Sequence, residues 1–327
     1  MVVDQNSTGR HVTTYSGLST TLRNPDQSQG EQVIGESIKD FYPNVYPTYP
    51  NRLPRESLAS GGYSLRFAES EEELDAIYQL RYDVFNLELA EGLNTSHETG
   101  RDEDEFDRFN HHLYVVEELT GICVGTYRMQ TSEMAATGIG FYARTEFDFS
   151  TFPESIFNNS VEIGRACIAS GHRTLRVLHL LWRGLGIYLT HNEMRYLFGC
   201  CSLTSQDERE GLAVYRYLQE NGHVLTDWTL YPLAENECRS FELVDQGELG
   251  ADASTQTEAD PDSEPEASTN SPETVKIPRL MRTYLSQGSK ICGPPAIDRA
   301  FKTIDYLALF DTQTMSKSAL AFYHIVG

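Results

Sequence analysis

Six charged side chains lie within apolar or structured stretches of this 327-residue chain, where a charge needs a partner or a ligand. An arginine can bind a carboxylate through two parallel hydrogen bonds, and a carboxylate can bind an ammonium group. Three cations and three anions gathered in one cleft would therefore recognise a zwitterion. The six residues are Arg81, Asp104, Asp107, Arg128, Glu162 and Arg165.

The segment "VEIGR" places Glu162 and Arg165 three residues apart on a predicted strand over 160–168. Residues three apart on a regular strand face opposite sides of the sheet. A bulge at Ile163-Gly164 would bring both side chains to one side, and glycine is the residue that permits it. A bulge also frees backbone N–H groups, which could hold the carbonyl oxygen of a thioester.

Each of these motifs also has a plain structural interpretation. Arg81 could be a helix residue paired with an acid, and Glu162 with Arg165 could form an ion pair without a catalytic role. The segment "DEFD" at 104–107 is, by itself, typical of a solvated acidic loop. The combined order of the motifs is what indicates a site.

Four arginines and no acid occur between Gly164 and Asn192, in a chain whose net charge is −22. Arg173 and Arg176 stand at the turn into a predicted helix, where backbone N–H groups already favour an anion. The segment "SGHR" has less glycine than a usual nucleotide-binding loop, so we expect one phosphate there, as on a phosphopantetheine arm. Alternatively, these arginines cap carbonyl groups or extend from a buried helix.

The sequence predicts neither a metal site nor a cysteine nucleophile. His111-His112 lacks metal-ligand spacing, none of the six cysteines forms a Cys-x-x-Cys pair, and Cys167 has no histidine at a telling spacing. This cysteine usage favours a reduced, cytoplasmic setting, and residues 1–17 contain no apolar segment typical of a signal peptide. The apolar run 177–189 is too short to cross a bilayer, so we expect at most peripheral contact with the inner membrane.

Hydrophobic periodicity predicts the elements that would position these groups. Their order predicts an α/β fold, in which helices flank a central sheet that is antiparallel first and parallel later. The expected strands cover 63–68, 113–119, 122–130, 160–168, 196–203 and the final "IDYLALF". The expected helices cover 70–89, with Ser70 as N-cap, then 174–192 and 207–222.

Composition divides the chain into four parts. Residues 1–61 are rich in Ser, Thr, Asn, Gly, Pro and Gln, which predicts a disordered arm. Eight acids and no base fall within 248–273, so we expect 247–275 to be a disordered acidic insertion. Residues 62–246 would form the core of one domain, and 276–327 would complete it. The net charge of −22 argues against a nucleic-acid partner.

Five segments resemble the hemolysin-like branch of the GNAT acyltransferases, and within it the L-ornithine N-alpha-acyltransferases of ornithine-lipid synthesis. They are "LRYDVFNLEL", "DEFDRFNHHLYVVEELTGICVGTYRM", "VEIGRACI", "LHLLW" and "YLFGCCSL". The C-terminal "GSKICGPPAIDRAFKTIDYLALFD" resembles the same group, so the similarity covers about 63–244 and 276–311. This resemblance implies a GNAT-like fold.

The resemblance also implies an N-acyltransferase. It would move a fatty acyl or 3-hydroxyacyl group from an acyl carrier protein to the α-amino group of an amino acid, L-ornithine in the first place. Glu162 would be the general base, with a pKa raised by partial burial. No cofactor is expected to stay bound, because the phosphopantetheine thioester is a co-substrate.

The other charged residues would bind the two substrates. Arg81, Arg128 or Arg165 would bind the acceptor carboxylate. Asp104 or Asp107 would bind a distal ammonium, which favours ornithine or lysine over a neutral amino acid. The carrier protein is acidic, so Arg173 and Arg176 must outweigh the overall repulsion within a Debye length of about 8–10 Å. The candidate residues therefore separate into one group for the amino acid acceptor and one group for the acyl donor.

Other functions stay open. Acyl-homoserine-lactone synthases are more distantly similar, but they carry a tryptophan where residues 90–103 have none. The glycine-poor loop argues against an acetyl-CoA-dependent GNAT enzyme. Another N-acyl amino acid synthase and a non-catalytic module that binds acyl carrier protein are the remaining alternatives, and the retained charged residues argue against the second.

Overall fold

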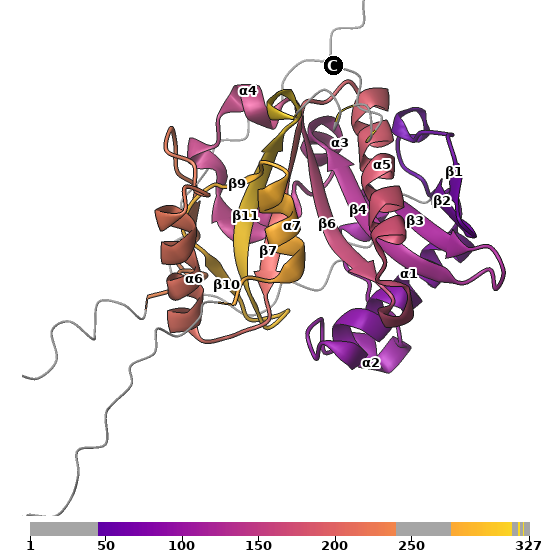
Figure 1. Cartoon of the computed structure of the whole chain (residues 1–327), viewed down its shortest axis with the longest axis horizontal. Coiled ribbons are helices and arrows are strands. Elements are labelled where there is room, and N and C mark those ends of the chain that lie inside the picture. The colour runs from indigo at the N-terminus through magenta and orange to yellow at the C-terminus, as the bar shows by residue number, and fades with distance from the viewer. Residues whose placement is uncertain (1–44, 240–275, 316–319, 321–322, 324–327) are drawn as a thin grey trace, which may run out of the picture. The chain divides into compact units, whose positions relative to one another are not determined.

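A single large sheet organises the chain. The computed structural model describes residues 45–239, 276–315, 320 and 323. The strand order is β1-β2-β3-β4-β6-β7-β11-β10, with β9 also paired to β11 (Figure 1). The strands are β1 Leu58–Ser60, β2 Tyr63–Phe67, β3 His111–Glu117, β4 Cys123–Thr131, β6 Ser160–Ile168, β7 Tyr196–Leu203, β9 Lys290–Ile291, β10 Ala296–Asp298 and β11 Thr303–Asp311.

The predicted mixed sheet is confirmed, with one parallel pair. Only β6 and β7 run parallel along this order, and every other pairing is antiparallel. A separate two-stranded sheet joins β5 (Phe147–Asp148) to β8 (Tyr231–Pro232). The helices are α1 Glu71–Arg81, α2 Ser96–Thr99, α3 Ser132–Thr137, α4 Glu154–Phe157, α5 Leu175–His191, α6 Glu208–Glu220 and α7 Arg279–Ser286.

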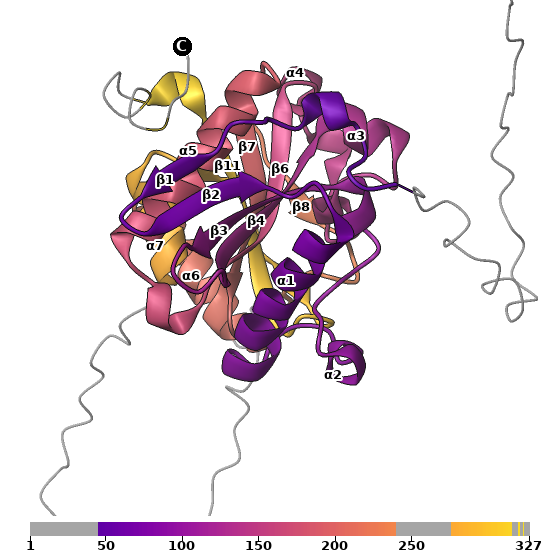
Figure 2. The ribbon, with the colours of Figure 1, turned by 90° about the vertical axis from the view of Figure 1, so that its right-hand side faces the viewer.

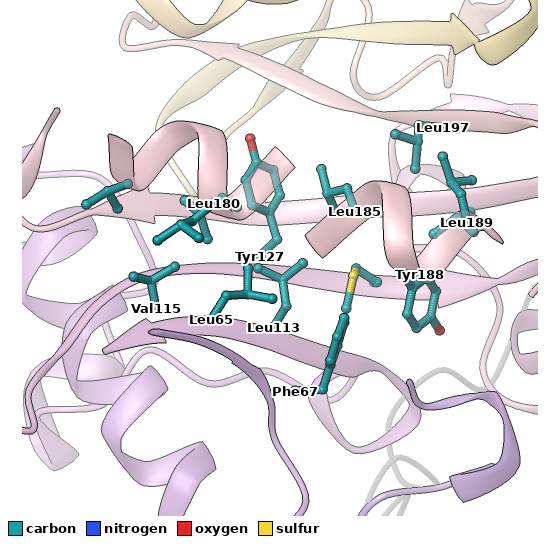
Figure 3. Close-up of a cluster of buried hydrophobic side chains, with 14 of the residues drawn as sticks. Leu65, Phe67, Leu113, Val115, Tyr127, Leu180, Leu185, Tyr188, Leu189 and Leu197 are labelled. Atoms are coloured by element: carbon teal, nitrogen blue, oxygen red, sulfur yellow. The ribbon is translucent and has the colours of Figure 1, made fainter. Parts of the chain in front are cut away.

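Alternation along the strands gives the sheet two different covers. Leu113 and Val115 of β3 pack with α5, whereas Tyr114 and Val116 pack on the opposite face with α1. Figure 2 shows α1 on the side of the sheet away from α5. The side chains between the strands and α5 form a buried apolar cluster that includes Tyr127 (Figure 3). We call these two sides the α5 face and the α1 face.

The first helix differs from the prediction in its second half. Ser70 caps it as expected, because its hydroxyl accepts a hydrogen bond from the Glu73 N–H at 3.3 Å. The expected continuous helix over 70–89 is α-helical only to Arg81 and continues as a π-helix, η3, over Tyr82–Glu88. π-Turns of this kind are frequent at functional sites.

The parallel strands β6 and β7 pair for only three residues. Ser160–Glu162 lie beside Tyr196–Phe198, and from Ile163 onward the edge of β6 that faces β7 pairs with no strand in the described part of the chain. Gly199 follows this pairing directly. A Cβ at Gly199 would lie 2.0 Å from the carbonyl oxygen of Ile163, so only glycine allows the two strands to approach here.

The bulge predicted in β6 exists but lies further along the strand. Thr126 of β4 pairs with Cys167, and Arg128 pairs with Gly164, so the extra residue falls after Gly164. Arg165 carries the left-handed backbone, with φ of 49°. The predicted position at Ile163-Gly164 was therefore wrong. The position of a bulge is set by how β6 pairs with β4, and the sequence does not show this pairing.

Part of the predicted disordered arm is structured. Leu58–Ser60 form the edge strand β1, and Leu53 is buried in the cluster under α5. Composition alone misplaced this boundary, because a few apolar side chains are enough to add an edge strand. Residues 1–44 and 240–275, which include the predicted acidic insertion, lie outside the described residues. None of the helices in the described ranges has the length and hydropathy of a membrane span.

Candidate active site

Strand register places polar side chains in a row on the α1 face of the sheet. Arg128 of β4 pairs with His112 of β3 and with Gly164 of β6. Glu162 lies two residues before Gly164 and therefore points to the same side as Arg128. On β7 the same side is occupied by Phe198, which pairs with Glu162. The sheet therefore brings these groups together from segments far apart in the sequence.

Arg81 is the centre of a buried ion network under this row. Its side chain is completely buried, and its Nε donates to Asp102 at 2.8 Å. Its Nη1 and Nη2 donate to the two carboxylate oxygens of Asp107 at 2.7 and 3.1 Å. Burial acts to raise the pKa of Asp107, but the neighbouring Arg81 and Arg128 hold this pKa well below its usual range.

Two further arginines extend the network toward the surface. Arg128 donates from Nη1 to Asp104 at 2.6 Å and to Asp107 at 3.0 Å. Arg165 donates from Nη2 to the other oxygen of Asp104 at 2.6 Å. The three arginines are thus matched by three aspartates, of which the sequence prediction had missed Asp102. The network is electrically balanced within itself.

Glu162 is held by the first backbone N–H groups of a neighbouring 3₁₀-helix, η5 (Tyr142–Thr145). Its two carboxylate oxygens accept hydrogen bonds from the N–H groups of Tyr142 and Ala143, at 2.8 and 2.7 Å. Only 7% of the residue is exposed. Burial raises the pKa of Glu162 to about 7, even though the two backbone N–H groups and the nearby Arg128 act to lower it. A carboxylate of this kind can accept a proton near neutral pH.

A cavity of about 620 Å³ lies where β6 and β7 separate. Its walls differ in character. On the α1 face it is lined by polar groups, among them Glu162, Arg128, Arg165 and Tyr142. On the α5 face it is lined mainly by apolar side chains, which include Leu178, Leu181, Trp182, Leu185, Leu197, Met281, Ala308 and Phe310. A ligand with a polar head and an apolar tail would match both walls.

The structure brings some of the predicted acceptor residues to this cavity and not others. Arg128 and Arg165 line it, as does Glu162. Arg81, Asp104 and Asp107 do not line it, and their hydrogen bonds go to one another and to neighbouring side chains. Direct contact of these three with an acceptor, as predicted, is at odds with this geometry. The sequence showed the charges but not which of them neutralise each other.

The two predicted donor residues lie in different surroundings. Arg173 lines the cavity, and its guanidinium forms an ion pair with Glu88 of η3. Arg176 does not line the cavity, and its Nη1 lies 3.4 Å from the carbonyl oxygen of Gly61. Thr174 caps α5 by accepting a hydrogen bond from the Val177 N–H. The predicted positive region is therefore partly neutralised, because one of its exposed arginines already has a carboxylate partner.

Comparison with known proteins gives this geometry a context. A family model described as "Acetyltransferase (GNAT) domain" matches residues 80–183. The L-ornithine N(alpha)-acyltransferase of Rhodobacter capsulatus is 30% identical over 267 residues, which cover 80% of this chain and 94% of the relative. The chain belongs to the L-ornithine N(alpha)-acyltransferase family. It is an acyltransferase with a GNAT-like fold.

Other members of this family and solved structures show further similarity. The L-ornithine N(alpha)-acyltransferase of Brucella abortus is 26% identical over 270 residues, which cover 80% of this chain and 89% of the relative. FeeM, an N-acyl amino acid synthase from uncultured soil microbes, is 8% identical with a TM-score of 0.41, over 77% of this chain and 92% of its own. The acyl-homoserine-lactone synthase LasI is 13% identical with a TM-score of 0.40, and the match covers 84% of this chain and 98% of LasI.

The candidate site contains residues that the sequence prediction missed. Tyr142 lies between Arg128 and Arg165, whose guanidinium carbons are 5.5 and 5.2 Å from its ring centre. Asp298 and Asp305 also line the cavity. Asp305 had a signal, because it is an acid within the apolar run "IDYLALF". Tyr142 had none, since it begins a short 3₁₀-helix, η5 (Tyr142–Thr145), that no sequence pattern indicated.

Proposed function

We propose that this protein transfers an acyl group from a thioester to the α-amino group of L-ornithine. The relatives' shared name supports the acceptor. The position of Glu162 carries the chemistry, because its side chain belongs to the polar wall of a cavity whose other wall is apolar. The acyl chain would lie along the apolar wall beside α5, and the amino acid would lie at the polar wall.

The reaction needs a proton acceptor and no covalent enzyme intermediate. The acceptor enters as an ammonium ion, and Glu162 takes one proton from it, directly or through a water molecule. The freed nitrogen lone pair attacks the thioester carbonyl carbon and forms the C–N bond. The C–S bond then breaks as the nitrogen gives up its second proton, and the sulfur takes that proton and leaves as a thiol, while the proton on Glu162 returns to solvent. Backbone N–H groups on the open edge of β6 would hold the oxyanion in between.

Arg128 and Arg165 are the proposed partners of the acceptor carboxylate. Both line the cavity, and the hydrogen bonds of Arg128 to Asp104 and Asp107 both come from Nη1. A guanidinium group has five N–H donors, so Nη2 of Arg128 has donors to offer a carboxylate. In this proposal the buried Arg81 and the aspartates set the positions of these two arginines.

An acyl carrier protein is the proposed donor, with Arg173 at the cavity mouth next to its phosphate. The double change Arg173→Glu and Arg176→Glu should raise the KM for acyl carrier thioester about 10-fold, within the range by which electrostatic steering changes association. The KM for ornithine should change little. The matched control is Arg209→Glu, an exposed arginine on α6 that does not line the cavity. Equal effects on both substrates, or an equal effect of the control, would argue against docking at Arg173.

The proposed function is tested with a panel of donors and acceptors. Purified protein is incubated with acyl carrier thioesters of several chain lengths, acetyl-CoA and a set of amino acids, and the products are identified by mass spectrometry. We expect Nα-acyl-ornithine from a long-chain carrier thioester. A homoserine lactone product, turnover with acetyl-CoA alone, or no turnover with any pair would each refute the proposal.

A further inference from the structure

Three neighbouring acidic side chains have no role in the mechanism above: Asp298 and Asp305 line the cavity, whereas Glu146 lies next to Asp305 and does not line it. Asp305 lies on β11 and Asp298 on β10, and Glu146 directly follows η5, the 3₁₀-helix that holds Glu162. Glu146 is 2% exposed, Asp305 is 4% exposed and Asp298 is 6% exposed. None of the three forms an ion pair with a lysine, arginine or histidine among the described residues. They contrast with the balanced network around Arg81.

Two carboxylate oxygens of this group lack donors. Within the described part of the chain, Oε1 of Glu146 and Oδ1 of Asp305 are buried and accept no hydrogen bond. Carboxylate oxygens of the two residues lie within 4.8 Å of each other and of the Cys200 sulfur. Asp298, in contrast, is held by the N–H groups of Ala300 and Phe301 and by the Tyr142 hydroxyl. The missing positive charge must therefore come from outside, as a proton or as a cation.

The electrostatics agree with a site for a positively charged ligand. Burial and the charges of Asp305 and Asp298 raise the pKa of Glu146 well above its usual range. Burial, together with the charge of Asp298, raises the pKa of Asp305 to about 6, although hydrogen bonds with Ser202, Thr303 and Glu146 act to lower it. Like charges held this close disfavour ionisation of one another, and a bound cation would relieve that cost. Such an arrangement is expected where a ligand supplies the compensating charge.

The position of the three acids matches the geometry of the proposed acceptor. Tyr142 connects them to the base, because its N–H binds Glu162 at 2.8 Å and its hydroxyl binds Asp298 at 2.9 Å. Strand register puts Asp305, opposite Ser202, on the same side as Glu162. In ornithine five covalent bonds separate the α- and side-chain nitrogens, which lie about 6 Å apart when the chain is extended. One nitrogen could thus face Glu162 while the other reaches the acids.

We propose that Asp298 and Asp305, which line the cavity, form the subsite that binds the side-chain ammonium group of the acceptor, and that Glu146, next to Asp305, adds negative charge to this subsite. This inference rests on the proposed function and replaces Asp104 and Asp107, whose charges are already neutralised by arginines, as the predicted ammonium ligands. A divalent metal ion is the competing occupant. Such an ion would lie between Glu146, Asp305 and the nearby Cys200 sulfur. Cys200 is a poor metal ligand, because burial and the charges of Glu146 and Asp305 raise the pKa of its thiol.

The test compares ornithine with norvaline, which has the same carbon chain without the side-chain ammonium. The wild-type protein should prefer ornithine in kcat/KM by about 10²–10⁴-fold, because norvaline leaves the buried acids without a partner. Asp305→Asn should lower kcat/KM for ornithine by about 10²-fold or more and leave that for norvaline unchanged or higher. Glu146→Gln should also lower kcat/KM for ornithine more than that for norvaline. It replaces Asp305→Asn in the test if that variant does not fold.

The matched control is Asp311→Asn, at the other end of β11. Asp311 pairs with Arg195 and does not line the cavity, so this variant should keep the wild-type preference for ornithine. Because its surroundings disfavour the ionised form of Asp305, the Asp305→Asn protein should melt at or above the wild-type temperature at pH 7.5. Treatment of the wild-type protein with a chelator should leave the preference unchanged.

The outcomes separate this inference from the proposed function. If the wild-type protein acylates neither amino acid, the proposed function fails. If it acylates ornithine and norvaline equally well, or if Asp305→Asn lowers both by the same factor, acyl transfer stands and the ammonium subsite is wrong. A preference that disappears with the chelator and returns with a divalent metal would also overturn the subsite in favour of a metal ion.

Discussion

Replacement of Glu162 by glutamine should lower kcat by about 10²–10⁴-fold, the usual contribution of a general base. The amide keeps the size of the side chain but cannot accept a proton near neutral pH. Because Glu162 acts on the nitrogen in the transition state, the KM values for thioester and ornithine should change by much less than kcat. Steady-state kinetics with both substrates varied would measure this split.

The control for this variant concerns its fold. Glutamine offers one carbonyl oxygen where Glu162 accepts from the N–H groups of both Tyr142 and Ala143, so one N–H is left without an acceptor. We expect this to lower the free energy of unfolding by about 1–3 kcal/mol. A melting curve shows whether the variant is still folded at the assay temperature. Wild-type kcat in a folded variant would remove Glu162 from the mechanism.

The substitution Asp107→Ala should have the largest effect on stability. Asp107 is 1% exposed and accepts hydrogen bonds from Arg81 and Arg128. Its removal leaves a buried guanidinium without its main partner, which typically costs about 3–5 kcal/mol. Because the pKa of Asp107 is lowered in the folded state, this contribution should be complete above about pH 4 and should decline only as the pH falls further. Chemical denaturation at pH 7 and at lower pH would measure it.

A solvent-facing ion pair provides the comparison. Arg195 and Asp311 are 39% and 21% exposed, and their contact is 2.6 Å long. Asp311→Ala should lower the free energy of unfolding by about 1 kcal/mol or less, as for other surface pairs. Similar losses from Asp107→Ala and Asp311→Ala would show that the Arg81 network does not stabilise the fold in the way described.

Local sequence patterns predicted the frame of the molecule well. Ser70 followed by three acids indicated the start of α1, and the continuous apolar run at 196–203 indicated a central strand. These features depend on neighbours in the chain, so one sequence can show them. The switch to a π-helix at Tyr82 and the edge strand at Leu58 depend on tertiary packing, and the sequence did not predict them.

The candidate site was predicted in its charges but not in their pairing. Glu162, Arg128 and Arg165 stood out as charges in apolar surroundings, and all three line the cavity. The pairing of each aspartate with its arginine depends on strand register and on the path of the loop over 101–110. Local hydrophobic periodicity predicts neither of these. Asp305 is different: the sequence did carry a signal for it, an acid within the apolar run of a buried strand, and the prediction overlooked that signal.

The most direct test is an infrared titration of the Glu162 carboxyl group, taken as the difference between the wild-type protein and Glu162→Gln. This account predicts a protonated-carboxyl band that disappears with a midpoint near pH 7 and is missing from the variant. It also predicts that ornithine and a non-reactive acyl-pantetheine analogue perturb the band. A midpoint near 4.5, or a band that neither ligand changes, would contradict a base at the junction of the two substrates.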